Sequence, residues 1–164
     1  MSPPPILPLP ALAIDQIAAG EVVESPAAIL KELIENSCDA GSDELIIEIE
    51  GGGLDRICIS DNGHGIPIEE LPLAIQRHAT SKVRCAEGIL SLSSMGFRGE
   101  ALASIGSVAH MTITSSTGER GGKISVKGGK ESRAMPCSRQ RGTTIDVTAI
   151  FDPVPARKAF LPSK

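Results

Sequence analysis

Apolar residues recur at helical spacing between Ser25 and Gly41, and this is the clearest periodic segment of the chain. Such spacing predicts a helix with one face in the core. Ser25 can cap its start and Pro26 suits its first turn, while Gly41 can end it. The pattern therefore predicts a helix over residues 25–40, with an apolar face formed by Ile29, Leu30, Leu33 and Ile34.

Strand patterns follow this helix. Residues 44–50 are rich in isoleucine, residues 54–60 alternate between apolar and polar, and three consecutive glycines separate the two runs. Runs of this length are typical of strands, so the segment predicts a β-hairpin. Further alternating runs predict strands near 107–115, 123–127 and 142–149.

The other segments predict a flexible arm and short helices. Five prolines among the first ten residues predict an irregular arm over residues 1–11, which leaves 12–164 for the folded domain. The predicted helices cover 14–19, where Gly20 would end the helix, 66–78, where Pro72 would break or restart it, and 99–105. The order of elements favours an α+β two-layer sandwich, with helices on one face of a mixed, mostly antiparallel sheet.

Composition is consistent with one domain that has a real core, because 41% of the 164 residues are hydrophobic. No apolar run approaches the ~20 residues that a membrane helix needs. The N-terminus also lacks the pattern of a signal peptide, so we expect an intracellular protein. The four cysteines and three histidines are scattered, which predicts reduced thiols and no zinc site.

Charge is distributed unevenly along the chain. Residues 1–76 hold 14 Asp and Glu against 2 Lys and Arg, and residues 77–164 hold 6 against 14, so the halves carry −12 and +8. Two interpretations stay open: the basic half binds an anionic partner, or the halves attract each other within one fold. Only three aromatic residues are present, which disfavours a surface for stacking single-stranded bases.

Acidic and amide side chains line one side of the predicted helix 25–40. With about 100° per residue, Asn36 lies about 40° to one side of Glu32 and Asp39 about 20° to the other. Glu32 and Asn36 are one turn apart and can reach one ligand. A general base needs a defined position and partial shielding, which favours Glu32 over Glu35. The amide oxygen of Asn36 suits Mg²⁺. A plain solvated stripe remains the alternative.

Two glycine-containing loops offer further chemistry. Asp61 follows a predicted strand in an Asp-x-Gly-x-Gly pattern, and a carboxylate fixed there can accept a hydrogen bond from an amine such as that of adenine. Glycines before the helix predicted at 99–105 can present backbone N–H groups to an anion. The segment GERGGK at 118–123 resembles a phosphate loop, but Ile124 replaces the required Ser or Thr, which predicts a hairpin turn instead.

The motifs KELIENSCDAG, DNGHGI, HATSK and GFRGEALASI occur in this order, with QIAAGEVVESP before them. Together they resemble the gyrase, chaperone, histidine-kinase and MutL ATPase superfamily, and specifically the N-terminal domain of the MutL family of DNA mismatch repair proteins. The resemblance runs from about residue 12 to the end of the chain. It implies a nucleotide pocket between helices and sheet, with ATP and Mg²⁺ as cofactors.

The resemblance also implies roles for individual residues. Glu32 would be the general base, Asn36 would bind Mg²⁺, and Asp39 would lie with them in the cofactor site. Asp61 would accept from the adenine amine, and Thr143 would support Asp61 from a neighbouring strand. The remaining implied contacts are Gly63 and Gly65 at the base, Thr80, Ser81 and Lys82 in a lid, and Gly96, Phe97, Arg98 and Gly99 at the phosphates.

Partners follow from the resemblance as well. It implies clamp-like dimerisation with bound ATP, as a homodimer or a MutL-type heterodimer, a MutS-type mismatch recognition partner, and DNA binding through the basic half. The stretch 152–157 departs from the family pattern in its middle. Relatives continue into a second domain that this sequence does not include, so we expect weak nucleotide binding and slow hydrolysis. Two other hypotheses stay open: a nucleotide-independent adaptor, and a metal-dependent hydrolase built on Glu32, Glu35, Asp39 and Asp61.

Overall fold

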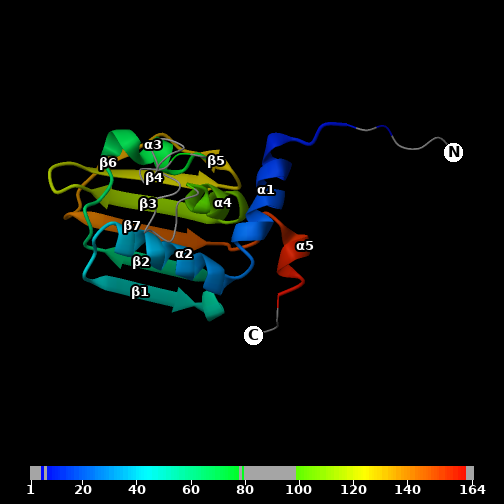
Figure 1. Ribbon diagram of the computed structural model, residues 1–164, viewed down its shortest axis with the longest axis horizontal. Coiled ribbons are helices and arrows are strands. Elements are labelled where there is room, and N and C mark those ends of the chain that lie inside the picture. The colour runs from blue at the N-terminus through cyan, green and yellow to red at the C-terminus, as the bar shows by residue number, and fades with distance from the viewer. Residues whose placement is uncertain (1–4, 6, 78, 80–98, 162–164) are drawn as a thin grey trace, which may run out of the picture.

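A seven-stranded sheet forms the centre of the molecule in a computed structural model, which describes residues 5, 7–77, 79 and 99–161 (Figure 1). The strand order is β1-β2-β7-β3-β4-β5, with β6 paired to β4, and each of the described pairs is antiparallel. The strands are β1 (Leu45–Glu50), β2 (Arg56–Asp61), β3 (His110–Ser116), β4 (Gly121–Lys127), β5 (Lys130–Glu131), β6 (Met135–Cys137) and β7 (Gly142–Thr148).

Helices cover one face of this sheet, with α2 over β2 and α4 over β3 and β4, while α1 packs against α4 (Figure 1). This arrangement confirms the predicted α+β architecture. The helices are α1 (Ala11–Val22), α2 (Pro26–Asp39), α3 (Leu71–Ala74), α4 (Ala101–Val108) and α5 (Pro155–Lys158), with short 3-10 turns at Gly51–Gly53 and Ile68–Glu70. Within the described residues, none of these helices is long and apolar enough to cross a membrane.

The helix predicted at 25–40 is confirmed as α2. The Ser25 hydroxyl accepts a hydrogen bond from the backbone N–H of Ala28 at 3.2 Å, which satisfies one of the free donors at the helix start. Gly41 follows the helix with a φ of +70°, a conformation that glycine adopts without strain. Ile29 and Leu33 are fully buried, so the predicted apolar face does meet the core.

Three predicted helices have other bounds than the sequence indicated. The helix expected at 14–19 begins at Ala11 and continues through Gly20 to Val22. The segment expected at 66–78 contains a 3-10 turn at Ile68–Glu70 and then the four residues of α3. Pro72 lies in the first turn of α3, where proline is tolerated, so a helix restarts at the proline and ends at Ala74. The third, expected at 99–105, is α4 and runs to Val108.

The core lies between the helices and the sheet. Isoleucine, valine and leucine dominate it, and one aromatic ring, that of Phe151, is fully buried there. Its largest fully buried side chains include Ile29, Leu33, Ile57, Ile59, Ile105, Met111, Ile113 and Phe151. The same packing holds α2 above the end of β2, where the site described below lies.

Ion pairs link the two halves of the chain. Arg56 Nη2 lies 3.0 Å from Asp146 Oδ2, but this pair joins a base of the acidic half to an acid of the basic half and does not lessen the asymmetry. Two other pairs do: Arg77 contacts Asp15 at 3.2 Å, and Arg120 contacts Glu69 at 3.5 Å. Charges from the acidic and basic halves are therefore neutralised in part within the fold. This supports the second interpretation of the charge asymmetry, while several basic side chains, such as Lys123 and Arg133, stay exposed.

Arg157 of α5 connects the two ends of the described chain. Its Nη2 donates to the carbonyl oxygens of Val23 at 2.6 Å and Gly20 at 3.0 Å, and its guanidinium lies 5.3 Å from the centre of the Phe151 ring. Carbonyl groups at a helix C-terminus lack partners within the helix, and a cation there satisfies them. Arg157 therefore supports the extension of α1 beyond Gly20.

Replacing Arg157 with alanine is expected to lower the free energy of unfolding by about 2–3 kcal/mol, because hydrogen bonds from a charged donor contribute most when partly buried. For a domain of this size the melting temperature would fall by roughly 4–12 °C. Lys158→Ala is the matched control, since the Lys158 side chain forms an exposed ion pair with Asp152. Calorimetry that finds equal melting temperatures for the two variants would contradict this role.

Candidate nucleotide site

The carboxylate of Asp61 is fixed at the end of β2 by three donors. Its Oδ1 accepts hydrogen bonds from the backbone N–H of Gly63 at 2.9 Å and of Thr143 at 3.1 Å. Its Oδ2 accepts from the hydroxyl of Ser37 at 3.0 Å. A carboxylate offers about four acceptor positions. One position on Oδ2 is therefore left for a donor such as an amine.

The backbone N–H of Thr143 binds Asp61, while its side-chain hydroxyl contacts a different residue, Ser115. The register pairs Asp61 with Thr143 across β2 and β7. The Thr143 hydroxyl lies 2.7 Å from that of Ser115, which also accepts from the Ile66 N–H at 2.8 Å. These buried hydroxyls join β7, β3 and the loop after Asp61 into one hydrogen-bonded unit. Support for Asp61 from a neighbouring strand thus has a structural counterpart.

Ser37 is a site residue that the sequence pattern did not indicate. It lies four residues after Leu33 on the buried side of α2 and is itself buried. Its hydroxyl is 3.1 Å from the Leu33 carbonyl and 3.0 Å from Asp61 Oδ2. A polar residue on an otherwise apolar helix face was the available signal, because a buried hydroxyl needs a hydrogen-bonding partner.

Gly63 and Gly65 lie where no side chain fits. A Cβ atom on Gly63 would lie 2.8 Å from the Ala40 carbonyl oxygen, and one on Gly65 would lie 2.0 Å from that of Ser116. Gly65 also has a φ of +75°. These glycines let the loop after β2 pack closely against other backbone segments of the protein. Gly63 packs against the end of α2, and Gly65 packs against the end of β3.

Glu32, Asn36 and Asp39 lie on α2 as the helical spacing predicted. The expected difference in shielding is not found, because the side chain of Glu35 is 15% exposed and that of Glu32 is 23% exposed. The two glutamates differ instead in their partner. Lys31 Nζ lies 2.8 Å from Glu35 and 4.0 Å from Glu32, so Glu35 is engaged and Glu32 remains the more available carboxylate.

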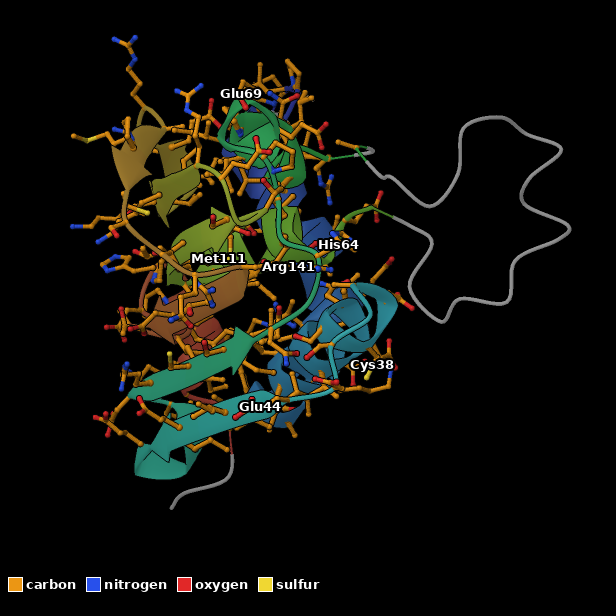
Figure 2. All side chains as sticks on the ribbon, turned by 90° about the vertical axis from the view of Figure 1, so that its left-hand side faces the viewer. Cys38, Glu44, His64, Glu69, Met111 and Arg141 are labelled. Atoms are coloured by element: carbon orange, nitrogen blue, oxygen red, sulfur yellow. The ribbon has the colours of Figure 1, made fainter. Side chains whose placement is uncertain are left out.

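The structure covers only part of the predicted phosphate contacts. Gly99 has a φ of +60° and lies just before α4, which begins at Ala101. His64 belongs to the loop that follows β2, Arg141 lies beside it, and Cys38 lies near the end of α2 (Figure 2). The other predicted contacts, Thr80, Ser81, Lys82, Gly96, Phe97 and Arg98, lie outside the described residues.

Comparison with known families places the chain in a class. Residues 23–138 match the family model described as histidine kinase-, DNA gyrase B- and HSP90-like ATPase. The matched region includes α2, the Asp61 loop and α4, and it covers more than half of the chain. The chain therefore belongs to this ATPase family.

Similar proteins narrow this assignment. The chain is 52% identical over 157 residues to the DNA mismatch repair protein MutL of Ralstonia nicotianae, covering 96% of this chain and 24% of the relative. It is also 52% identical over 157 residues to MutL of Chlamydia pneumoniae, covering 95% of this chain and 27% of the relative. These matches confirm the resemblance to the N-terminal ATPase domain of MutL. The chain spans about a quarter of the length of these curated relatives.

Solved structures with a similar fold agree with this assignment to the MutL ATPase domain. The N-terminal domain of a DNA repair protein superposes with a TM-score of 0.73 at 31% identity, covering 90% of this chain and 42% of that one. The Aquifex aeolicus MutL ATPase domain complexed with ADP superposes with a TM-score of 0.67 at 28% identity, covering 87% of this chain and 49% of that one. One of these similar domains, that of Aquifex aeolicus MutL, was thus solved with a bound adenine nucleotide.

Proposed function

We propose that this chain binds ATP, with the Asp61 carboxylate accepting a hydrogen bond from the amino group of adenine. The observation that carries the proposal is the free acceptor position on Asp61 Oδ2, since three donors hold the rest of the carboxylate. The ADP complex of the Aquifex aeolicus domain supports the choice of an adenine nucleotide. Gly63 and Gly65 shape the loop beside the base. The proposed lid contains Thr80, Ser81 and Lys82. The proposed phosphate contacts are Gly96, Phe97, Arg98 and Gly99.

Hydrolysis is proposed to use α2. The Glu32 carboxylate takes a proton from the water whose oxygen attacks the terminal phosphorus, and ADP leaves. Asn36 would hold Mg²⁺ through its amide oxygen, with Asp39 nearby on the same helix, and both are hard oxygen donors. Bound Mg²⁺ neutralises phosphate charge. Within the described residues no cluster of three His, Cys, Asp or Glu could hold a metal, so the ion would also need phosphate ligands.

The biological setting is proposed from the MutL relatives. ATP binding would drive clamp-like dimerisation, as a homodimer or a MutL-type heterodimer, and slow hydrolysis would reset it. A MutS-type mismatch recognition protein and DNA would be the partners, with exposed basic residues of the second half meeting the phosphate backbone. The matched names, DNA mismatch repair protein MutL, support this setting.

Two other functions remain as alternatives, and they predict different results when the chain is titrated with an ATP analogue. A nucleotide-independent adaptor would bind no ATP analogue. A metal-dependent hydrolase built on Glu32, Glu35, Asp39 and Asp61 would bind Mg²⁺ alone, which the lack of a metal-holding cluster in the described residues disfavours. Isothermal titration with a non-hydrolysable ATP analogue, with and without Mg²⁺, separates all three functions.

Asp61→Asn is expected to lower the affinity for ADP by about tenfold or more. The amide keeps an oxygen for the N–H groups of Gly63 and Thr143, but its NH₂ group replaces Oδ2 and faces the adenine amine with a second donor. Titration calorimetry with ADP and Mg²⁺ measures the change.

Asp152→Asn is the matched control, because this exposed carboxylate follows β7 at the opposite end of the sheet from Asp61. It should leave the ADP affinity unchanged. Equal affinities for Asp61→Asn and the unaltered chain would remove Asp61 from the site. If the unaltered chain binds no ADP at millimolar concentration, the proposed function itself is wrong.

A further inference from the structure

Two arginines from the segment before β7 hold the backbone of the Asp61 loop. Arg139 Nη2 lies 3.3 Å from the Asp61 carbonyl oxygen, and Arg141 Nε donates to the Gly63 carbonyl oxygen at 3.3 Å. Arg141 is visible beside His64 in Figure 2. The carbonyl groups of this loop are thus bound by cations that lie 78 positions later in the chain.

Arg139 also joins β2 to β7. Its Nη2 lies 2.8 Å from the Thr144 hydroxyl and 3.2 Å from the Ser60 hydroxyl, and these two hydroxyls are a cross-strand pair 2.8 Å apart. Its Nη1 donates to the Gln140 carbonyl at 2.9 Å, which holds the guanidinium plane. A planar group with several donors can hold such an arrangement, whereas a lysine ammonium cannot.

The charge of Arg139 is partly shielded from water. Burial lowers the pKa of Arg139, and the negative charge of Asp61 acts in the opposite direction. A guanidinium in a protein keeps its proton at neutral pH, so the group stays charged despite this shift. Arg139 therefore places a permanent positive charge next to the backbone carbonyl of Asp61, the residue proposed to bind the base.

Two of the contacts that hold Asp61 depend on the stretch that leads into β7. Its backbone is bound by Arg139, which also holds Thr144, and its carboxylate is bound by the neighbouring Thr143 N–H. A recognition group loses much of its effect when its position changes by about 0.5 Å. We propose that Arg139, assisted by Arg141, is a positioning residue for adenine recognition and acts through Asp61. This inference rests on the proposed ATP binding.

The test compares ADP with purine riboside 5′-diphosphate, which lacks only the 6-amino group. Titration calorimetry with Mg²⁺ gives both affinities for the unaltered chain, Arg139→Gln, Arg139→Lys and Arg133→Gln. The unaltered chain should favour ADP by about 30-fold, and Arg139→Gln should reduce this ratio to about threefold. Arg139→Lys should be intermediate. Arg133→Gln changes an exposed arginine in the connection between β5 and β6 and should keep the full ratio.

The ratio distinguishes positioning from stability. A variant that merely folds less well loses affinity for both nucleotides equally, so its ratio stays at that of the unaltered chain. An unchanged ratio in Arg139→Gln overturns the positioning role and leaves the proposed function standing. If the unaltered chain binds both nucleotides equally, Asp61 does not read the amine and this inference is wrong. If it binds neither, the proposed function is also wrong.

Discussion

Glu32→Ala is expected to reduce the rate of ATP hydrolysis by about 100-fold or more, while the affinity for ADP stays within about twofold. A positioned general base contributes about 10²–10⁴-fold to rate. It acts only when water attacks, so its removal affects the transition state and leaves nucleotide binding largely intact. Phosphate release at saturating ATP and titration with ADP measure the two quantities separately.

Glu35→Ala is the matched control on the same helix. Lys31 holds Glu35 at 2.8 Å, and the Glu35 side chain is slightly less exposed than that of Glu32. Hydrolysis should therefore survive in Glu35→Ala within a few-fold. If Glu35→Ala stops hydrolysis and Glu32→Ala does not, the assignment of the base is reversed. Shielding from water does not favour Glu32 over Glu35 as the base. The ion pair between Glu35 and Lys31 does favour Glu32, and the two variants test whether it decides the role.

Gly65→Ala is expected to lower the free energy of unfolding by about 3 kcal/mol or more and to abolish detectable ADP binding. A left-handed conformation costs an ordinary residue about 1–2 kcal/mol. The added methyl group would also lie 2.0 Å from the Ser116 carbonyl oxygen, so the loop or the end of β3 must move. Any such movement displaces the segment that donates to Asp61. Urea unfolding measures the first effect and titration the second.

Gly52→Ala separates crowding from backbone strain. Gly52 has a φ of +66°, close to that of Gly65, but nothing lies within 4 Å of the position its Cβ would take. Its substitution should cost only about 1–2 kcal/mol and leave ADP binding unchanged. Equal losses of stability in the two variants would show that close packing against Ser116 contributes nothing.

Sequence patterns predicted the elements that have a strong period of their own. The spacing in α2, the hairpin of β1 and β2, and the turn followed by β4 after residue 117 are all found. The short strands β5 and β6 were missed, because two- and three-residue strands carry no measurable period and form by pairing with β4. The helix α1 was predicted too short, because the partner of its Gly20 carbonyl is 137 positions away.

The sequence by itself determined the family, the buried face of α2 and the acidic and amide residues on the opposite side. These features depend on residue types at fixed spacing, which are visible along the chain. The tertiary structure decided how Asp61 is held. Ser37 reaches it from α2, and Arg139 and Thr143 reach it from the stretch that leads into β7. Thr143 does so with a backbone N–H, for which no side chain gives a signal. Hydrogen bonds between distant segments exist only after the sheet and α2 have packed together.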